Sequence, residues 1–360
     1  MALWFAVAMA ILQAVDATVA PLDPRWSLPF DTPPAAAAGF DATTAYVPLK
    51  GGQLVAVDIE RGTVRWRLDV ATAFTPATGD GLVFTTAEAS IEARDAATGA
   101  TRWRTALPGG AAVPLYWDTG WLLASTTNGD LAAFRASDGT LVWRQPLGAP
   151  LAAAPAPALD RLFLPLADNR LVAVLLATGE TVWTKTLTGR ISGLLALDEQ
   201  LVFGTTANQV ISLRVSDGRE RWTWRIGGDI SGTPSADEDH IYFAARDNVL
   251  RAVDRNNGNL QWKASLSSRP VGGPLPLPNM VLMPLVSSEI AGFELEAGKP
   301  ATTAKAGGEL GVRPFFRPGA RATAVRLVTV SREGQLQGFA QRFELPPVPL
   351  DVLPGLPAVP

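Results

Sequence analysis

The chain has 360 residues and a formal net charge of −3, from 31 Lys and Arg against 34 Asp and Glu. Such a balance gives no overall positive field, so nucleic acid is not expected as a partner. The lack of Cys excludes disulfides, thiolate zinc sites and thiol nucleophiles, and a single His limits imidazole chemistry to one position.

The first element in chain order is an apolar stretch over residues 1–15, which is too short to span a bilayer. Small residues follow it, and together they predict a signal peptide over residues 1–20, with Ala17 as the best cleavage point. The protein would then be exported, to the periplasm of a bacterium. The alternative is a short buried strand of the fold, because no Lys or Arg precedes the stretch.

From residue 56 onward, a segment of the form Ala-x-Asp-x-x-(Thr/Asp)-Gly-x-x-x-Trp recurs with little change of phase. Two short apolar runs, such as residues 200–203 and 209–213, precede each Trp and are separated by turn residues. These runs predict strands, and no stretch has a sustained helical period. A repeat of about 40 residues with four short strands is one blade of a β-propeller. The copies span residues 56–66, 93–103, 133–143, 173–183, 212–222 and 252–262.

The two ends of the repeat complete each other. Trp26 lies in an orphan copy of the outer strand, 40 residues before Trp66, whereas the runs at 325–330 and 335–339 have no Trp strand after them. Thr302 stands where the last complete unit should have Trp. We therefore predict an all-β, eight-bladed propeller of four-stranded antiparallel blades over residues 24–345, closed by the N-terminal strand. The Trp residues expected to dock between blades, in a structural role, are Trp26, Trp66, Trp103, Trp143, Trp183, Trp222 and Trp262.

The last segment, residues 346–360, contains six Pro among apolar residues. This composition disfavours sheet and helix and predicts an extended tail. The propeller itself is expected to be monomeric, with no transmembrane span.

The docking motif resembles the tryptophan-docking repeat of the pyrroloquinoline-quinone (PQQ)-like propellers, over about residues 24–340. Eight blades of this size without further domains resemble the propellers of the outer-membrane assembly lipoproteins within that family. This resemblance implies a non-catalytic, protein-binding scaffold that acts in bacterial envelope or outer-membrane protein assembly. It implies no catalytic residue, no metal and no cofactor.

The alternative within the same family is a PQQ- and calcium-dependent dehydrogenase, or a propeller that binds a small ligand. Resemblance to the dehydrogenases would imply a vicinal Cys pair, Asp, Glu and Asn ligands around Ca²⁺, and a catalytic Asp. None of that set is recognisable, so no cofactor-binding residue can be named. The densest acidic run, residues 237–239 beside His240, is interpreted as a solvated turn rather than a calcium site.

Seven residues after each outer-strand Trp, the repeat reaches a loop that borders one mouth of the central channel. The eight positions are Pro33, Ala73, Gly110, Pro150, Arg190, Asp229, Arg269 and Glu309. Four consecutive blades thus carry alternating charges. Our hypothesis is a protein or peptide partner bound by Arg190, Asp229, Arg269, Glu309 and Arg313, extended by Arg317 and Arg321. The alternative is a set of exposed ion pairs that serve only solubility.

Overall fold

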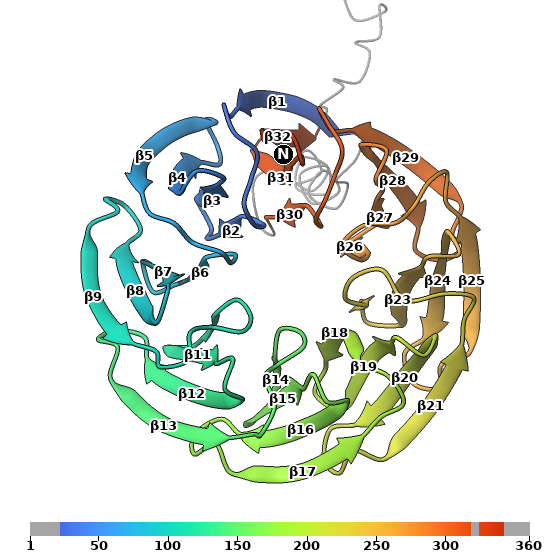
Figure 1. The fold of residues 1–360 in the computed structure, drawn as a ribbon. Helices are drawn as coiled ribbons and strands as arrows, with labels where there is room; N and C mark the ends of the chain where they lie inside the picture. Colours follow the sequence, from blue (N-terminus) through green and yellow to red (C-terminus); the bar gives the residue numbers. More distant parts are fainter. Residues whose placement is uncertain (1–21, 318–323, 342–360) are drawn as a thin grey trace, which may run out of the picture.

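The computed structural model describes residues 22–317 and 324–341, and within them there are strands and turns but no helix. The strands form eight four-stranded antiparallel sheets, arranged as blades around a ring (Figure 1). The predicted eight-bladed propeller is therefore confirmed. No helix in these two ranges is long and apolar enough to span a bilayer. The expected signal peptide, residues 1–20, and the expected Pro-rich tail, residues 346–360, lie outside the described residues.

Each blade runs from an inner strand at the channel to an outer strand, and in every blade but the fifth the inner strand is the shorter of the two. Blades 1 to 4 comprise β2 (Gly39–Phe40), β3 (Thr44–Leu49), β4 (Gln53–Asp58) and β5 (Thr63–Asp69); β6 (Ala77–Gly79), β7 (Leu82–Ala87), β8 (Ser90–Asp95) and β9 (Thr101–Ala106); β10 (Tyr116–Asp118), β11 (Trp121–Ser125), β12 (Asp130–Arg135) and β13 (Leu141–Pro146); and β14 (Ala156–Ala158), β15 (Arg161–Pro165), β16 (Arg170–Leu175) and β17 (Thr181–Thr186).

Blades 5 to 8 repeat the plan, and the last takes its outer strand from the other end of the chain. They comprise β18 (Ile191–Ala196), β19 (Gln200–Thr205), β20 (Gln209–Arg214) and β21 (Glu220–Arg225); β22 (Ser235–Ala236), β23 (His240–Ala245), β24 (Val249–Asp254) and β25 (Leu260–Ser265); β26 (Leu275–Leu277), β27 (Met280–Pro284), β28 (Glu289–Glu294) and β29 (Pro300–Lys305); and β30 (Phe315–Phe316), β31 (Val325–Val330), β32 (Gln335–Gln341) and β1 (Leu22–Pro29).

The ring closes as predicted, because β1 pairs antiparallel with β32 and sets Trp26 opposite Gly338. Blades 8 and 1 also share a core, in which Val328 of β31 belongs to the same buried cluster as Val47 of β3. At the inner edge, the rings of Phe40 and Phe315 stack with centroids 4.4 Å apart. The joint between the two chain ends is thus packed from the outer strand to the channel.

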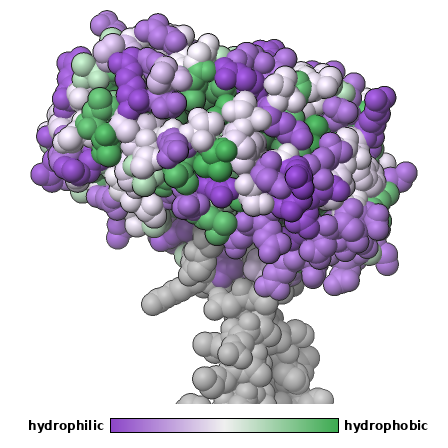
Figure 2. Space-filling model, turned by 90° about the horizontal axis from the view of Figure 1, so that it is seen from below, coloured by the Kyte–Doolittle hydropathy of each residue, from purple (hydrophilic) through white to green (hydrophobic). Residues whose placement is uncertain are grey.

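Burial follows the layers of each blade. The second and third strands are covered on both sides by neighbouring blades, so β3 is buried at every residue and reads as a continuous apolar run. Outer strands alternate between exposed and half-buried residues, as β13 does. Leu141, 51% exposed, belongs to this outer wall. Figure 2 shows one side of the molecule, where separate green apolar patches lie among purple polar residues.

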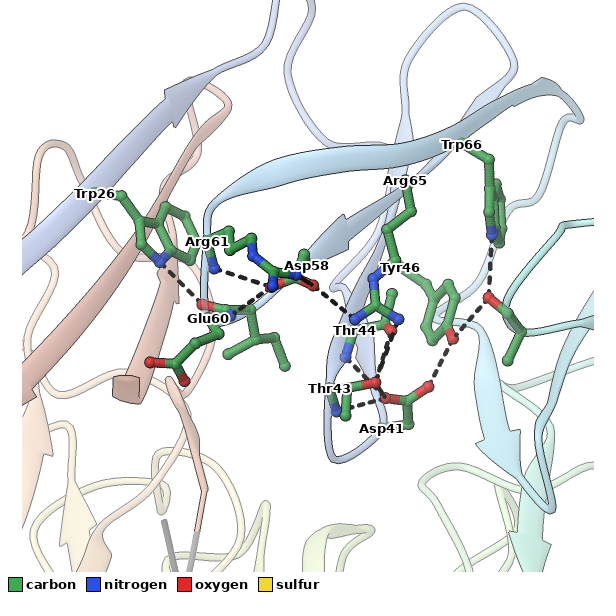
Figure 3. A network of polar contacts seen from close by, with 12 residues as sticks. Trp26, Asp41, Thr43, Thr44, Tyr46, Asp58, Glu60, Arg61, Arg65 and Trp66 are labelled. Carbon is green, nitrogen blue, oxygen red and sulfur yellow. Dashed lines mark hydrogen bonds and ion pairs between the residues drawn. The ribbon is translucent and has the colours of Figure 1, made fainter. Parts of the chain in front are cut away.

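The outer-strand Trp residues dock each blade onto the next. The indole Nε1 of Trp26 donates to the Ile59 carbonyl at 2.9 Å, and that of Trp66 donates to the Ala96 carbonyl at 3.0 Å (Figure 3). The same bond recurs from Trp103, Trp143, Trp183 and Trp262. In the docking turn, Asp58 accepts from the backbone N–H of Glu60 and of Arg61. The Asp of the motif therefore orders the turn that receives the preceding Trp.

Trp222 is the exception to this pattern. Its Nε1 is buried and has no hydrogen-bond partner. The carbonyl at the matching position, that of Arg255, instead accepts from Nε2 of Gln200 at 2.8 Å. The ring still lies against Gly258, as the other docking rings lie against their glycines. Packing thus keeps the docking geometry where the hydrogen bond is lost.

Candidate partner-binding face

Two loops of each blade meet on one side of the ring. One is the connection that crosses to the next blade, and the other is the turn between the second and third strands. In blade 8 the backbone N–H of Arg332 donates to the Glu309 carbonyl at 2.8 Å, and in blade 5 that of Thr206 donates to the Arg190 carbonyl at 2.9 Å. We call this side the crossing face. The opposite side, formed by docking turns such as residues 58–62, is called the docking face.

The structure places four of the five predicted rim residues at the crossing face. Arg190, Asp229, Arg269 and Glu309 each come directly before the residue that begins the inner edge of a blade. Arg190, Arg269 and Glu309 are exposed, and Asp229 is half-buried. No ion pair within 4.0 Å joins these residues to one another or to any other described side chain. Their charges are therefore available to a partner.

The final-blade residues that the hypothesis added do not all belong with this rim. Arg313 lies further along the inner run of blade 8 and is half-buried. Arg317 is wrongly placed by the hypothesis, because it forms an ion pair with Glu60 at 2.9 Å on the docking face. The chain crosses the height of the blade between Leu310 and Arg317, since an extended strand rises about 3.3 Å per residue. Arg321 lies outside the described residues.

Three further cations of the crossing face were missed. Lys50, Arg246 and Arg332 occupy the turns between second and third strands, and all three are exposed. Lys50 and Arg246 stand sixteen residues before Trp66 and Trp262, a fixed phase of the repeat. Counting backward from each Trp, as well as forward, finds Lys50 and Arg246 but not Arg332, since no Trp follows Arg332 in the chain.

These cations line two neighbouring pockets. One, of about 370 Å³, lies between blades 8 and 1 and is lined by Lys50, Val312 and Arg332, among others. The other, of about 330 Å³, lies among blades 6 to 8 and is lined by Arg246, Arg269 and Arg332. Gly311 and Arg332 belong to both linings. The two pockets therefore adjoin, and together we call them the cationic groove, defined by Lys50, Arg246, Arg269 and Arg332.

The cationic groove differs from the docking face in how its charges are paired. On the docking face Arg65 contacts Asp58 at 2.7 Å, and Arg102 contacts Asp95 at 2.6 Å. Hydrogen bonds from Arg102 and Thr98 lower the pKa of Asp95 to about 2. By contrast, the side chains of the cationic groove have neither an ion pair nor a hydrogen bond within residues 22–317 and 324–341.

Arg313 adds a further unpaired cation near the groove. Burial lowers the pKa of its guanidinium, and no described carboxylate lies near enough to offset this cost. Its backbone packs directly against Gly272, where a Cβ would lie 2.2 Å from the Arg313 nitrogen. Close contact between the inner edges of blades 7 and 8 thus holds Arg313 beside the groove.

The acidic run near His240 is structural. Asp237 Oδ1 accepts the backbone N–H groups of Asp239 and His240, and Oδ2 accepts the Tyr242 hydroxyl at 2.5 Å. Burial alone would raise the pKa of Asp237, but these hydrogen bonds outweigh it and lower the pKa. His240 is half-buried rather than a surface residue. Its side chain is 16% exposed, and its Nδ1 lies 3.4 Å from Oδ1 of Asp237.

Metal-binding geometry is not found in the described part of the chain. There, no three His, Asp or Glu side chains are grouped so that they could hold an ion. Asp254, in a loop that superficially resembles a calcium-binding sequence, accepts from the backbone N–H of Asn256 and of Asn257. It orders a docking turn.

Comparisons with known proteins agree with this architecture. The family model described as outer membrane protein assembly factor BamB matches residues 87–189 and 167–311, more than half of the chain. No curated protein sequence matches. The solved structure of BamB from Moraxella catarrhalis is similar with a TM-score of 0.70 and 17% identity, covering 89% of this chain and 100% of that one.

Two other solved structures share the fold. A computationally designed protein, Ika8, is 12% identical with a TM-score of 0.73, covering 87% of this chain and 97% of its own. Quinohemoprotein alcohol dehydrogenase from Comamonas testosteroni is 12% identical with a TM-score of 0.72, covering 91% and 78%. Likenesses this distant in sequence establish the propeller fold and leave function to the residues.

Proposed function

We propose that this chain, which belongs to the family of the outer membrane protein assembly factor BamB, is a non-catalytic scaffold that binds a protein partner through its crossing face. The proposal places the protein outside the cytoplasm of a bacterium, in the assembly of outer-membrane proteins. Family membership supports the cellular location and the process. The charged residues of the crossing face support the binding of a protein partner.

The observation that carries the proposal is the set of unpaired charges on the crossing face. Exposed charged side chains on a folded surface commonly pair when partners are near, as they do on the docking face of this propeller. Arg190, Arg269 and Glu309 lie within one half of the ring without such partners. Charged groups arranged in this way give a partner orientation and speed its association more than they stabilise the fold.

The test is genetic complementation in the bacterium from which the chain derives. Deletion should lower the amount of β-barrel proteins in the outer membrane, and the wild-type chain should restore it. The variant Arg190→Glu with Arg269→Glu should be exported and folded but should not restore it. The matched control is Lys263→Glu with Lys299→Glu, which makes the same charge change at exposed residues away from the crossing face. Unchanged β-barrel levels on deletion would overturn the proposal.

The dehydrogenase alternative requires a site for Ca²⁺ and the quinone. A hard cation needs several converging oxygens, and the described residues bring no three carboxylate or imidazole groups together. The described residues therefore do not fit the cofactor, and no step through it is derived. Dye-linked alcohol oxidation after addition of PQQ and Ca²⁺ would favour the alternative instead.

A further inference from the structure

We infer that the cationic groove binds an acidic, extended segment of a partner protein. The inference rests on the proposed function and adds to it the chemistry of the partner and the place where it lies. The groove extends over blades 6, 7, 8 and 1, which are consecutive around the ring (Figure 1).

Charge is the first argument for an acidic partner. The residues that line the two pockets include four cations. No Asp or Glu is among the lining residues. A pocket of the docking face provides the contrast, since its lining combines Arg161, Arg214 and Arg221 with Asp198 and Glu199. Among the described residues no carboxylate lines the cationic groove, and carboxylates of a ligand would supply the opposite charge.

The acidic residues nearest in sequence do not perform that role. Asp247 and Glu333 directly follow Arg246 and Arg332, and Asp229 and Glu309 lie in crossing loops, but none of these four lines either pocket, and Asp247 pairs with Arg251. They flank the groove on the same face. Their positions would exclude a ligand with negative charge along its whole length and favour one whose acidic groups alternate with neutral ones.

The remaining lining indicates what lies between those acidic groups. Apolar side chains line the pockets together with the cations, including Val312 and Val330 in one pocket and Val271 and Val286 in the other. Arg246 and Arg269 line one pocket, Lys50 lines the other and Arg332 lines both, so the four cations are spread over two pockets rather than gathered around one. A segment with alternating acidic and apolar side chains fits this spacing, and extended chain alternates its side chains in that way.

We infer that the segment belongs to another protein and not to the C-terminal part of this chain. β32 ends at Gln341, which pairs with Leu22. This end of blade 8 is the docking-face end, because Val325 beside it contacts Glu60 of a docking turn. The chain thus leaves its last strand on the side away from the groove, and beyond it the sequence contains only Glu344 and Asp351 as acidic residues.

Fluorescence anisotropy with the purified full chain tests the inference. The probe is a fluorescein-labelled peptide of about eight residues in which Glu alternates with Leu, compared with its Gln and Leu counterpart. The Glu peptide should bind more tightly, and its affinity should fall as salt is raised. Arg269→Glu with Arg332→Glu should weaken binding by about tenfold or more, whereas Lys263→Glu with Lys299→Glu should not.

Several results would overturn the inference. These are equal binding of the two peptides, equal loss in the two double variants, or binding of anionic phosphatidylglycerol vesicles without binding of the Glu peptide. Circular dichroism and the urea midpoint of each variant verify that it is folded. Because this assay uses no cellular partner, its failure would leave the result of complementation to decide the proposed function separately.

Discussion

Replacing Gly179 by Ala tests whether docking glycines are required by backbone geometry alone or also by the Trp of the preceding blade. Gly179 has a φ of +74°, and an added Cβ would lie 2.7 Å from Cε3 of Trp143. Gly81 provides the matched control, with a φ of +73° and nothing within 4 Å of an added Cβ. Both variants are expected to suffer the same backbone strain, and only Gly179→Ala displaces a ring.

The magnitudes follow from these two contributions. A left-handed backbone costs an L-residue about 1 to 2 kcal/mol, partly offset by the lower entropy of the unfolded Ala chain. Forcing the Trp143 ring outward adds about 1 to 3 kcal/mol of overpacking. It also strains the 2.9 Å hydrogen bond from Trp143 Nε1 to the Leu176 carbonyl. We expect Gly81→Ala to cost about 1 kcal/mol and Gly179→Ala about 2 to 4 kcal/mol.

Urea unfolding followed by Trp fluorescence measures both variants against the wild type. The midpoint should fall more for Gly179→Ala than for Gly81→Ala, with similar slopes. Equal losses of stability in the two variants would refute the reasoning, because they would mean that the docked ring moves aside without cost.

Two other predictions concern polar groups of the blades. Trp143→Phe should destabilise the protein by about 1 kcal/mol more than Trp222→Phe in urea unfolding, because only Trp143 loses an indole hydrogen bond. The pKa of Asp237 is lower in the folded protein than its usual value of 3.8, so the folded state binds fewer protons and its contribution to stability is lost as the pH falls below about 4. Asp237→Asn should make the acid dependence shallower, measured as unfolding midpoints between neutral pH and about pH 3, and an unchanged profile would contradict that assignment.

Much of the fold was predictable because the same pattern of apolar runs, turn residues and Trp recurs along the chain, so each copy supports the interpretation of the others. The Trp of an outer strand and the Gly of the next docking turn are fixed by a contact that recurs at seven interfaces between blades, such as Trp26 with Gly62. The degenerate unit at Thr302 could be placed by phase alone, and the structure pairs it with Gly292 in the expected register.

The candidate site was only partly predictable. A count forward from each Trp finds Arg190 and Arg269, but Lys50 and Arg332 reach the same face in turns that bond to Pro33 and Glu309, on separate stretches of chain. The hypothesis also added Arg317 to the rim, although the inner run of blade 8 takes it to Glu60 on the docking face. Height along a strand, rather than distance from a Trp, decides which face a residue reaches.

The sequence by itself determined the blade, the number of blades and the closure of the ring by Trp26, because these depend on a periodic pattern of turns and apolar runs. Only the tertiary structure decided which charges are paired and which are free. Arg65 forms an ion pair with Asp58 in the same blade. The four cations of the groove come from blades at both ends of the chain. Pairing depends on distances of a few ångströms between residues far apart in sequence, and those distances exist only once the ring has closed.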